Sequence, residues 1–168
     1  MPDLCGNKGE WSEIYIFLKL MSDGKVYAAD KNMNRLTNVF LNIIKIIREE
    51  YRNQKYEYYT GPVVKIFLNE TEVGPDVNIS DFQAARDQLW NVLKNAPRGN
   101  GITCDTVETF LSSIYVTKLK APAAQQNEFF GGTQDITMQV QDYRNGIASV
   151  IGLSLIHISE PTRHAQIS

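Results

Sequence analysis

The stretch Asp135-Ile-Thr-Met-Gln-Val-Gln-Asp142 decides the fold. Its apolar residues alternate strictly with polar ones, which is typical of a β-strand with one buried face and one polar face. The next segment, Tyr143-Arg-Asn-Gly146, contains an Asn-Gly turn signal, and residues 147–151 then predict a return strand. Together these segments predict a β-hairpin with Asp135 on the polar face at its open end.

Upstream of the hairpin, helical and strand patterns follow one another along the chain. Helices are predicted over residues 10–21, from Ser80, where Ser80 and Gln83 form a capping-box pattern, and from Asp105. Short apolar or aromatic runs predict strands at 25–29, 56–59, 63–68 and 114–119. Residues 40–47 fit either a strand or a helical stripe, and their β-branched isoleucines favour the strand. The predicted fold class is therefore α/β, with helices packed on a mixed sheet.

Composition limits the class of protein. The 168 residues are 43% apolar and 21% charged, which is typical of a globular chain, and no apolar run is long enough to span a bilayer. The first residues lack the basic and apolar regions of a signal peptide, so we expect a cytoplasmic protein with no membrane partner. The net charge of −2 shows no basic footprint of the kind that nucleic-acid-binding proteins usually carry.

The C-terminal residues differ in origin from the rest. The string Leu153-Ser-Leu-Ile-His-Ile-Ser-Glu-Pro-Thr-Arg163, followed by His-Ala-Gln-Ile-Ser168, resembles a translation of the transposon-derived adapter used in short-read library preparation. We therefore expect residues 1–152 to be natural sequence and residues 153–168 to be translated adapter; an ordinary C-terminal strand is the alternative. Both histidines lie in this tail, so chemistry in residues 1–152 must rest on carboxylates, lysines, hydroxyls or cysteines.

Three stretches together resemble the HpaII family of type II restriction endonucleases. They are Gly6-Asn-Lys-Gly-Glu-Trp-Ser-Glu-Ile-Tyr15, Asp23-Gly-Lys-Val-Tyr-Ala-Ala-Asp30, and Asp135–Asp142 with Gly152 after it. The likeness runs through residues 6–152. It implies the N-terminal part of a PD-(D/E)xK-like nuclease core, here incomplete, from an enzyme that cuts duplex DNA at a short palindrome of C and G bases with Mg²⁺. Palindromic targets often go with two-fold dimers, so a homodimer is the implied assembly.

The resemblance assigns roles to three acidic residues. In the PD-(D/E)xK class an Asp opens the first hairpin strand and binds the metal, which makes Asp135 the implied Mg²⁺ ligand and catalytic residue. Glu10 and Glu13 lie three residues apart at the start of a predicted helix, where related nucleases use a Glu to help hold metal or water. Acids at a helix start are also favoured by the helix dipole alone, and Asp135 fits an ordinary turn residue.

The resemblance also implies a lysine on the return strand. That lysine would fall at Ile156, inside the tail, so we expect the 168-residue chain to be inactive. Asp142 is interpreted as the residue that caps the hairpin turn. The alternative from a different class is a non-catalytic α/β interaction or regulatory domain, in which Asp135 has no catalytic role.

Overall fold

The 17-residue strand β2 is the centre of the sheet in a computed structural model that describes residues 4–51, 53–96, 101–119, 136–154 and 166–167. One edge of β2 pairs with β1 and then with β3, and its other edge pairs with β7. The strands run β5-β4-β3-β2-β7-β8-β9, with β6 beside β4. Their bounds are β1 Lys25–Ala29, β2 Arg35–Tyr51, β3 Gln54–Tyr59, β4 Val63–Leu68, β5 Thr71–Glu72, β6 Val77–Asn78, β7 Ile136–Asp142, β8 Ala148–Ser154 and β9 Gln166–Ile167.

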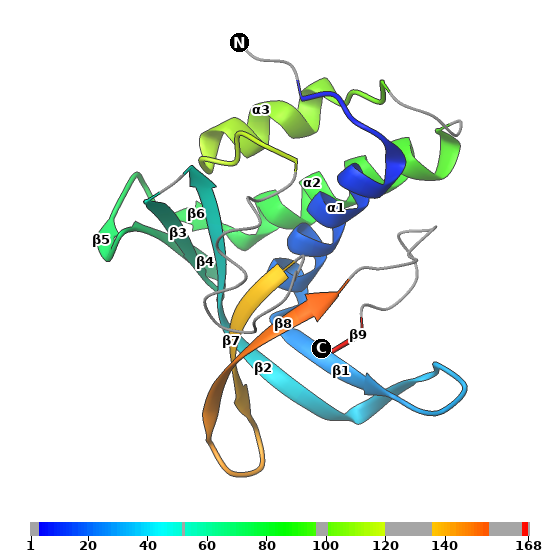
Figure 1. Ribbon diagram of the computed structural model, residues 1–168, viewed down its shortest axis with the longest axis vertical. Coiled ribbons are helices and arrows are strands. Elements are labelled where there is room, and N and C mark those ends of the chain that lie inside the picture. Colours follow the sequence, from blue (N-terminus) through cyan, green and yellow to red (C-terminus); the bar gives the residue numbers. More distant parts are fainter. Residues whose placement is uncertain (1–3, 52, 97–100, 120–135, 155–165, 168) are drawn as a thin grey trace.

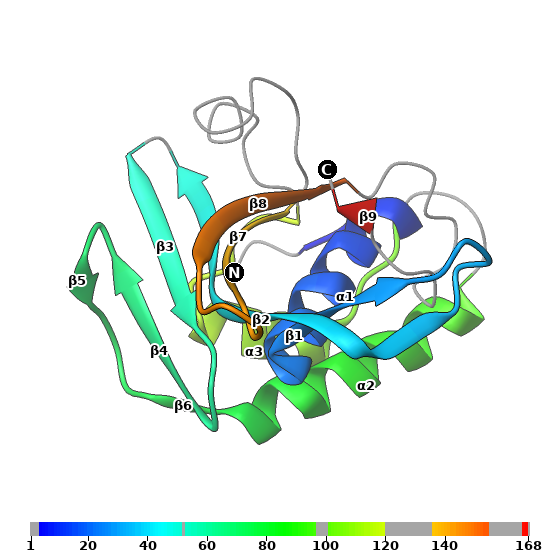
Figure 2. The same cartoon turned by 90° about the horizontal axis from the view of Figure 1, so that it is seen from below.

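Three helices, α1 (Lys8–Asp23), α2 (Ile79–Asn95) and α3 (Asp105–Ser113), pack on one side of this sheet (Figure 1). Figure 2 shows that the sheet curves around α1. The predicted α/β class, with helices against a sheet, is confirmed. The sheet was expected to be mixed, whereas all ladders within the described residues are antiparallel.

Helix α1 has strong local signals at both ends. Asn7 caps its start: Glu10 N donates to Asn7 Oδ1 at 2.8 Å, and Asn7 N donates to Glu10 Oε1 at 3.2 Å. Its end is set by Gly24, whose φ of +67° is accessible to glycine without strain and whose N–H donates to Leu20 O. The helix predicted over residues 10–21 is confirmed and extends by two residues at each end.

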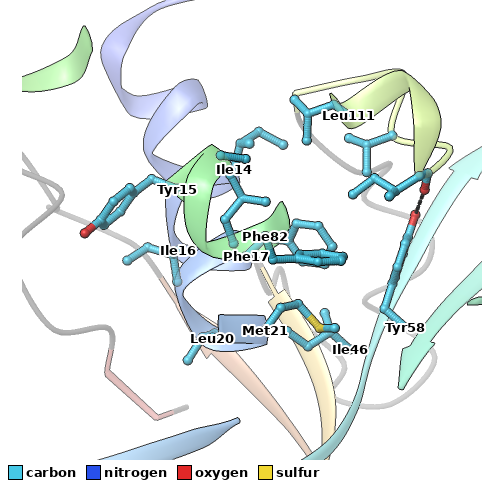
Figure 3. Packing of buried hydrophobic residues seen from close by; sticks show 14 of the residues in the cluster. Ile14, Tyr15, Ile16, Phe17, Leu20, Met21, Ile46, Tyr58, Phe82 and Leu111 are labelled. Atoms are coloured by element: carbon cyan, nitrogen blue, oxygen red, sulfur yellow. Dashed lines mark hydrogen bonds between the residues drawn. The ribbon is translucent and has the colours of Figure 1, made fainter. Parts of the chain in front are cut away.

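The main core lies between α1 and the sheet. Phe17 of α1 meets Tyr58 of β3 edge to face at 5.1 Å between ring centroids, and Phe82 of α2 lies 6.4 Å away on its other side. The Tyr58 hydroxyl donates to Ile114 O at 2.7 Å, so this fully buried side chain also ties β3 to the end of α3 (Figure 3). Burial raises the pKa of Tyr58, which keeps its hydroxyl protonated as a donor.

The predicted β7–β8 hairpin is confirmed. Alternate β7 residues face the core and are nearly fully buried, and β8 pairs with β7 from Ala148 to Leu153. In the turn, Gly146 has φ +71° and donates its N–H to Asp142 O. The Asp142 carboxylate accepts from Arg144 N at 2.8 Å, which confirms Asp142 as the capping residue of this turn. The strand interpretation of residues 40–47 is also confirmed, because they lie within β2.

Two local predictions are wrong. Helix α2 begins at Ile79 with Asn78 as the N-cap and no side-chain capping bond, so Ser80 and Gln83 form no capping box. Residues 114–119 form a turn and an irregular segment rather than a strand. Tyr115 has φ +67°, and side chains of β2 bond the backbone at Thr117 and Lys118 in place of a neighbouring strand.

We expect Tyr58→Phe to lower the free energy of unfolding by about 1–3 kcal/mol, because the buried carbonyl of Ile114 loses its donor. Urea denaturation followed by circular dichroism measures the change. The control is Tyr27→Phe, since the Tyr27 hydroxyl makes no hydrogen bond within the described residues; its effect should stay within about 0.5 kcal/mol. Equal stabilities of the two variants would contradict this role for the Tyr58 hydroxyl.

Candidate functional site

The predicted metal ligand, Asp135, lies outside the described residues, and β7 begins one residue later at Ile136. The start of β7 is held between two strands, because Thr137 pairs with Ile47 of β2 and with Gly152 of β8. This end of the sheet, where β7 begins and the β2–β7 ladder ends at Ile47, is the candidate site.

One face of the sheet carries the polar residues of β7. Opposed residues of an antiparallel ladder point to the same side. Thr137 is opposite Ile47, which is opposite Glu57 of β3, and Gln139 is opposite Lys45, which is opposite Tyr59. The intervening residues, such as Ile46 and Met138, point into the core. We call the polar side the outer face; it comprises Lys45, Ile47, Glu57, Tyr59, Thr137 and Gln139.

Thr137 is the residue of the outer face nearest to the predicted metal ligand. Its side chain is 1% exposed, and its Oγ1 atom has no hydrogen-bond partner within the described part of the chain. A buried hydroxyl without a partner loses the free energy of about one hydrogen bond. Thr137 therefore offers an unused oxygen two residues from Asp135.

Glu10 and Glu13 have different environments. The Glu10 carboxylate takes part in the capping box of α1, as described above. Glu13 is 9% exposed and lies one turn before Phe17 on the same side of the helix. The Asp135 carboxylate, with which both glutamates were expected to share the site, lies outside the described residues.

The direction of α1 shows where Glu13 points. Met21 lies beside Ile46 (Figure 3), and the Arg48 guanidinium lies 5.6 Å from the centre of the Phe17 ring. Helix α1 therefore runs antiparallel to the second half of β2, and Glu13 extends toward the end of β2 that pairs with the start of β7. Because α1 packs on the core face of the sheet, Glu13 approaches this end of the sheet from the face opposite Thr137.

Sequence reasoning missed a buried ion pair at the same end of the sheet. Arg48 and Glu50 are 5% and 1% exposed, and Arg48 Nε donates to Glu50 Oε2 at 3.1 Å. Arg48 Nη2 also donates to Lys118 O at 2.9 Å, and Glu50 Oε1 accepts from Thr117 N. The pair fixes residues 117–118 against β2. In the sequence it is visible only as the charged run Arg48-Glu49-Glu50 after the isoleucines of β2.

The segment after α3 also reaches the start of α1. A Cβ atom added at Gly6 would lie 2.6 Å from Leu119 Cδ1, so only glycine fits there without movement of a neighbour. The start of α1, the Arg48–Glu50 pair and residues 117–119 thus converge near the candidate site.

A pocket of about 570 Å³ opens on the outer face and is lined by Lys45, Lys55, Glu57, Tyr59, Phe67, Asn69 and Glu70. Lys45 forms an ion pair with the buried Glu57 and also donates to the Tyr59 hydroxyl at 3.4 Å. Burial lowers the pKa of Lys45, but the hydrogen bond and charge of Glu57 outweigh burial, so the pKa is raised. The structure therefore brings a fully charged lysine next to the β7 polar residues.

Two further observations concern the described residues as a group. They contain no cluster of three or more histidine, cysteine, aspartate or glutamate side chains able to hold a metal ion. No helix among them is both long enough and apolar enough to cross a membrane.

Comparisons with known proteins identify relatives. A family model described as HpaII restriction endonuclease matches residues 7–157. The type II restriction enzyme HpaII of Haemophilus parainfluenzae is 30% identical over 154 residues, which cover 89% of this chain and 40% of that enzyme. No solved structure matches the chain. The matched region includes α1, the β7–β8 hairpin and every element between them, while the chain spans less than half of the curated relative's length.

We expect Glu50→Gln to lower the free energy of unfolding by about 3–5 kcal/mol, because it leaves the Arg48 guanidinium buried without its opposite charge. The double variant R48M/E50L, which removes both charges, should recover most of that loss. Guanidinium denaturation measures both values. The exposed Glu70→Gln is the matched control, and an E50Q variant as stable as E70Q would refute the prediction.

Proposed function

Because the chain belongs to the HpaII restriction endonuclease family, we propose that it forms part of a type II site-specific deoxyribonuclease that hydrolyses phosphodiester bonds of duplex DNA with Mg²⁺. The observation that carries this proposal is the family match across residues 7–157. The chain spans 40% of the curated relative, so the activity belongs to the longer enzyme of which this chain is a part. The substrate in this proposal is a short palindrome of C and G bases, bound by a homodimer in the cytoplasm.

In this proposal Asp135 is the metal ligand and catalytic residue. A bound Mg²⁺ polarises the phosphate and activates a water molecule for attack. Mg²⁺ prefers oxygen ligands, and oxygen atoms of that kind would come from the carboxylate of Asp135 and from the Thr137 hydroxyl, which has no hydrogen-bond partner within the described residues. The alternation of β7 predicts that residues 135 and 137 share the outer face, so Thr137 Oγ1 is placed to donate to a water or phosphate oxygen held by Asp135.

Glu13 has the supporting role in this site. Its position on the side of α1 that faces the end of β2 supports a function in holding water or metal from the helix side. Glu10 is a weaker candidate, because its carboxylate already bonds the backbone at Asn7. Capping by Glu10 and catalysis by Asp135 and Glu13 are separable by mutation.

We further propose that residues 153–168 are translated adapter. The support for this proposal is the adapter-like sequence of residues 153–163; Leu153 pairs with Ile136 and the family match continues to residue 157, so we infer that this segment begins where the family's return strand would continue. Position 156, where the nuclease class requires a lysine, holds Ile156, which lies outside the described residues. An isoleucine cannot stabilise the charge that develops on the phosphate.

Asp135→Asn is expected to weaken binding of Mn²⁺, used as a spectroscopic substitute for Mg²⁺, by about tenfold or more, because a neutral amide replaces an anionic ligand. Paramagnetic broadening of the amide resonances of Thr137 and its strand neighbours measures the binding. The matched control is Asp81→Asn on the exposed side of α2. Unchanged broadening near Thr137 in D135N would remove Asp135 from the site and favour a non-catalytic interaction domain.

The 168-residue chain is expected to leave supercoiled plasmid uncut in Mg²⁺, because position 156 lacks an amine. Ile156→Lys should raise the nicking rate by about 10²-fold, the effect typical of one charge-stabilising group, whereas Ile156→Gln should not. Gel electrophoresis measures nicking, and D135N combined with I156K serves as the metal-site control. Site-specific cleavage by the unmodified chain would contradict the expected inactivity.

A further inference from the structure

Two hairpins meet at the end of the sheet opposite the candidate site. They are the β1–β2 hairpin and the β7–β8 hairpin, which both extend away from α2 and α3 (Figure 1). Phe40 of β2 stacks on Tyr143 of the β7–β8 turn, with 4.4 Å between ring centroids and an interplanar angle of 15°. The Tyr143 hydroxyl donates to Asn38 O at 2.6 Å, which fixes the two hairpins to each other. Tyr27 of β1 extends the ring cluster, 5.9 Å from Phe40.

Each ring of this cluster carries a cation. Lys25 Nζ lies 4.4 Å from the centre of the Phe40 ring, and the guanidinium carbons of Arg35 and Arg144 lie 4.7 Å and 5.9 Å from the Tyr27 and Tyr143 rings. For Lys25 and Arg35 such contacts hold the cation in place while its N–H groups face no carboxylate within the described residues, whereas Arg144 also donates from Nε and Nη2 to Asp142. We call this arrangement the hairpin fork; it consists of Lys25, Arg35, Arg144, Tyr27, Phe40 and Tyr143.

The fork is locally basic in an acidic chain. Residues 25–42 and 142–147 contain four lysines and arginines against two aspartates, whereas the whole chain has a net charge of −2. Asp30 accepts from the backbone of Asn32 and Asn34 within its own turn. Asp142 is bound by Arg144, so only Lys25, Lys31 and Arg35 have no carboxylate partner within the described residues.

The fork and the candidate site lie at the two ends of one strand and on one face. Tyr27 pairs with Phe40, and Asn42 pairs both with Lys25 and with Gln141 of β7, so these side chains share the outer face with Gln139 and Thr137. Strand β7 has seven residues, which at about 3.3 Å each separate the fork from the candidate site by about 20 Å. That separation equals the rise of about six base pairs along the axis of a duplex.

We propose that the hairpin fork binds the phosphate backbone of duplex DNA beside the cleaved position, with Lys25, Arg35 and Arg144 as the contacting cations. This proposal rests on the proposed function. The contact is to phosphate because Lys25 and Arg35 present charged N–H groups that no carboxylate neutralises within the described residues, and such groups match phosphate oxygens. Contacts of this kind set the affinity and position of a protein on DNA without reading its sequence.

The test measures binding of a fluorescein-labelled 20-base-pair duplex to the 168-residue chain by anisotropy, over a range of KCl concentrations without divalent metal. The triple variant K25Q/R35Q/R144Q should bind at least about tenfold more weakly at low salt. Its slope of log K against log [salt] should be smaller by about two to three, because each lost phosphate contact removes about 0.9. The charge-matched control K19Q/R86Q/K94Q, on α1 and α2, should match the unmodified chain.

The outcomes separate the two proposals. A chain that binds no duplex even at low salt would contradict the proposed function together with the fork. Equal binding of duplex DNA by the unmodified chain and the triple variant would overturn the fork alone. The fork would also be overturned if the triple variant kept its DNA affinity and lost only a homodimer measured by sedimentation. If the triple variant loses its native circular dichroism, R35Q decides the matter, since Arg35 is exposed, has no carboxylate partner within the described residues and should reduce the slope by about one.

Discussion

Pairing along both edges of β2 is the constraint on which the rest of the structure depends. Ile47 is held between Glu57 on one side and Thr137 on the other, so the register of β2 fixes both β3 and β7. A shift by one residue would turn Ile46 out of the core and Lys45 into it. The same strand then continues into the buried Arg48–Glu50 pair, which anchors residues 117–118. One register thus positions the core, the ion pair and the start of β7.

The elements that could be predicted from the sequence are those whose signals are local. The capping of α1 by Asn7 and Glu10 spans three residues, and Gly24 ends the helix by its own conformation. The alternation of β7 and the Asn-Gly turn after it likewise need no information from elsewhere in the chain. The family could be identified for a related reason, because the three stretches that carry the resemblance are each continuous in sequence and lie at the start of α1, across β1 and in β7.

The features that could not be predicted depend on residues far apart in the chain. Residues 114–119 have the apolar composition of a strand, but their backbone is bonded by Arg48 and Glu50, which lie 70 and 67 residues away from their partners. Lys45 was not recognised as a neighbour of the β7 polar face because that proximity arises only from the β2–β7 register. For Glu10, sequence spacing alone does not separate a capping role from a site role, since both place an acid in the first turn.

Net charge is a poor guide to the DNA contact proposed for the hairpin fork. The total of −2 suggests no affinity for a polyanion, but charges on a protein surface are screened within about 10 Å at 0.1 M salt. A phosphate at the hairpin fork would therefore interact with Lys25 and Arg35 more strongly than with carboxylates about 20 Å away at the other end of β7, while Arg144 is already paired with Asp142. In the proposed function, separation of these cations from the metal-binding acids along one strand would let the same face attract DNA at one end and hold the metal at the other.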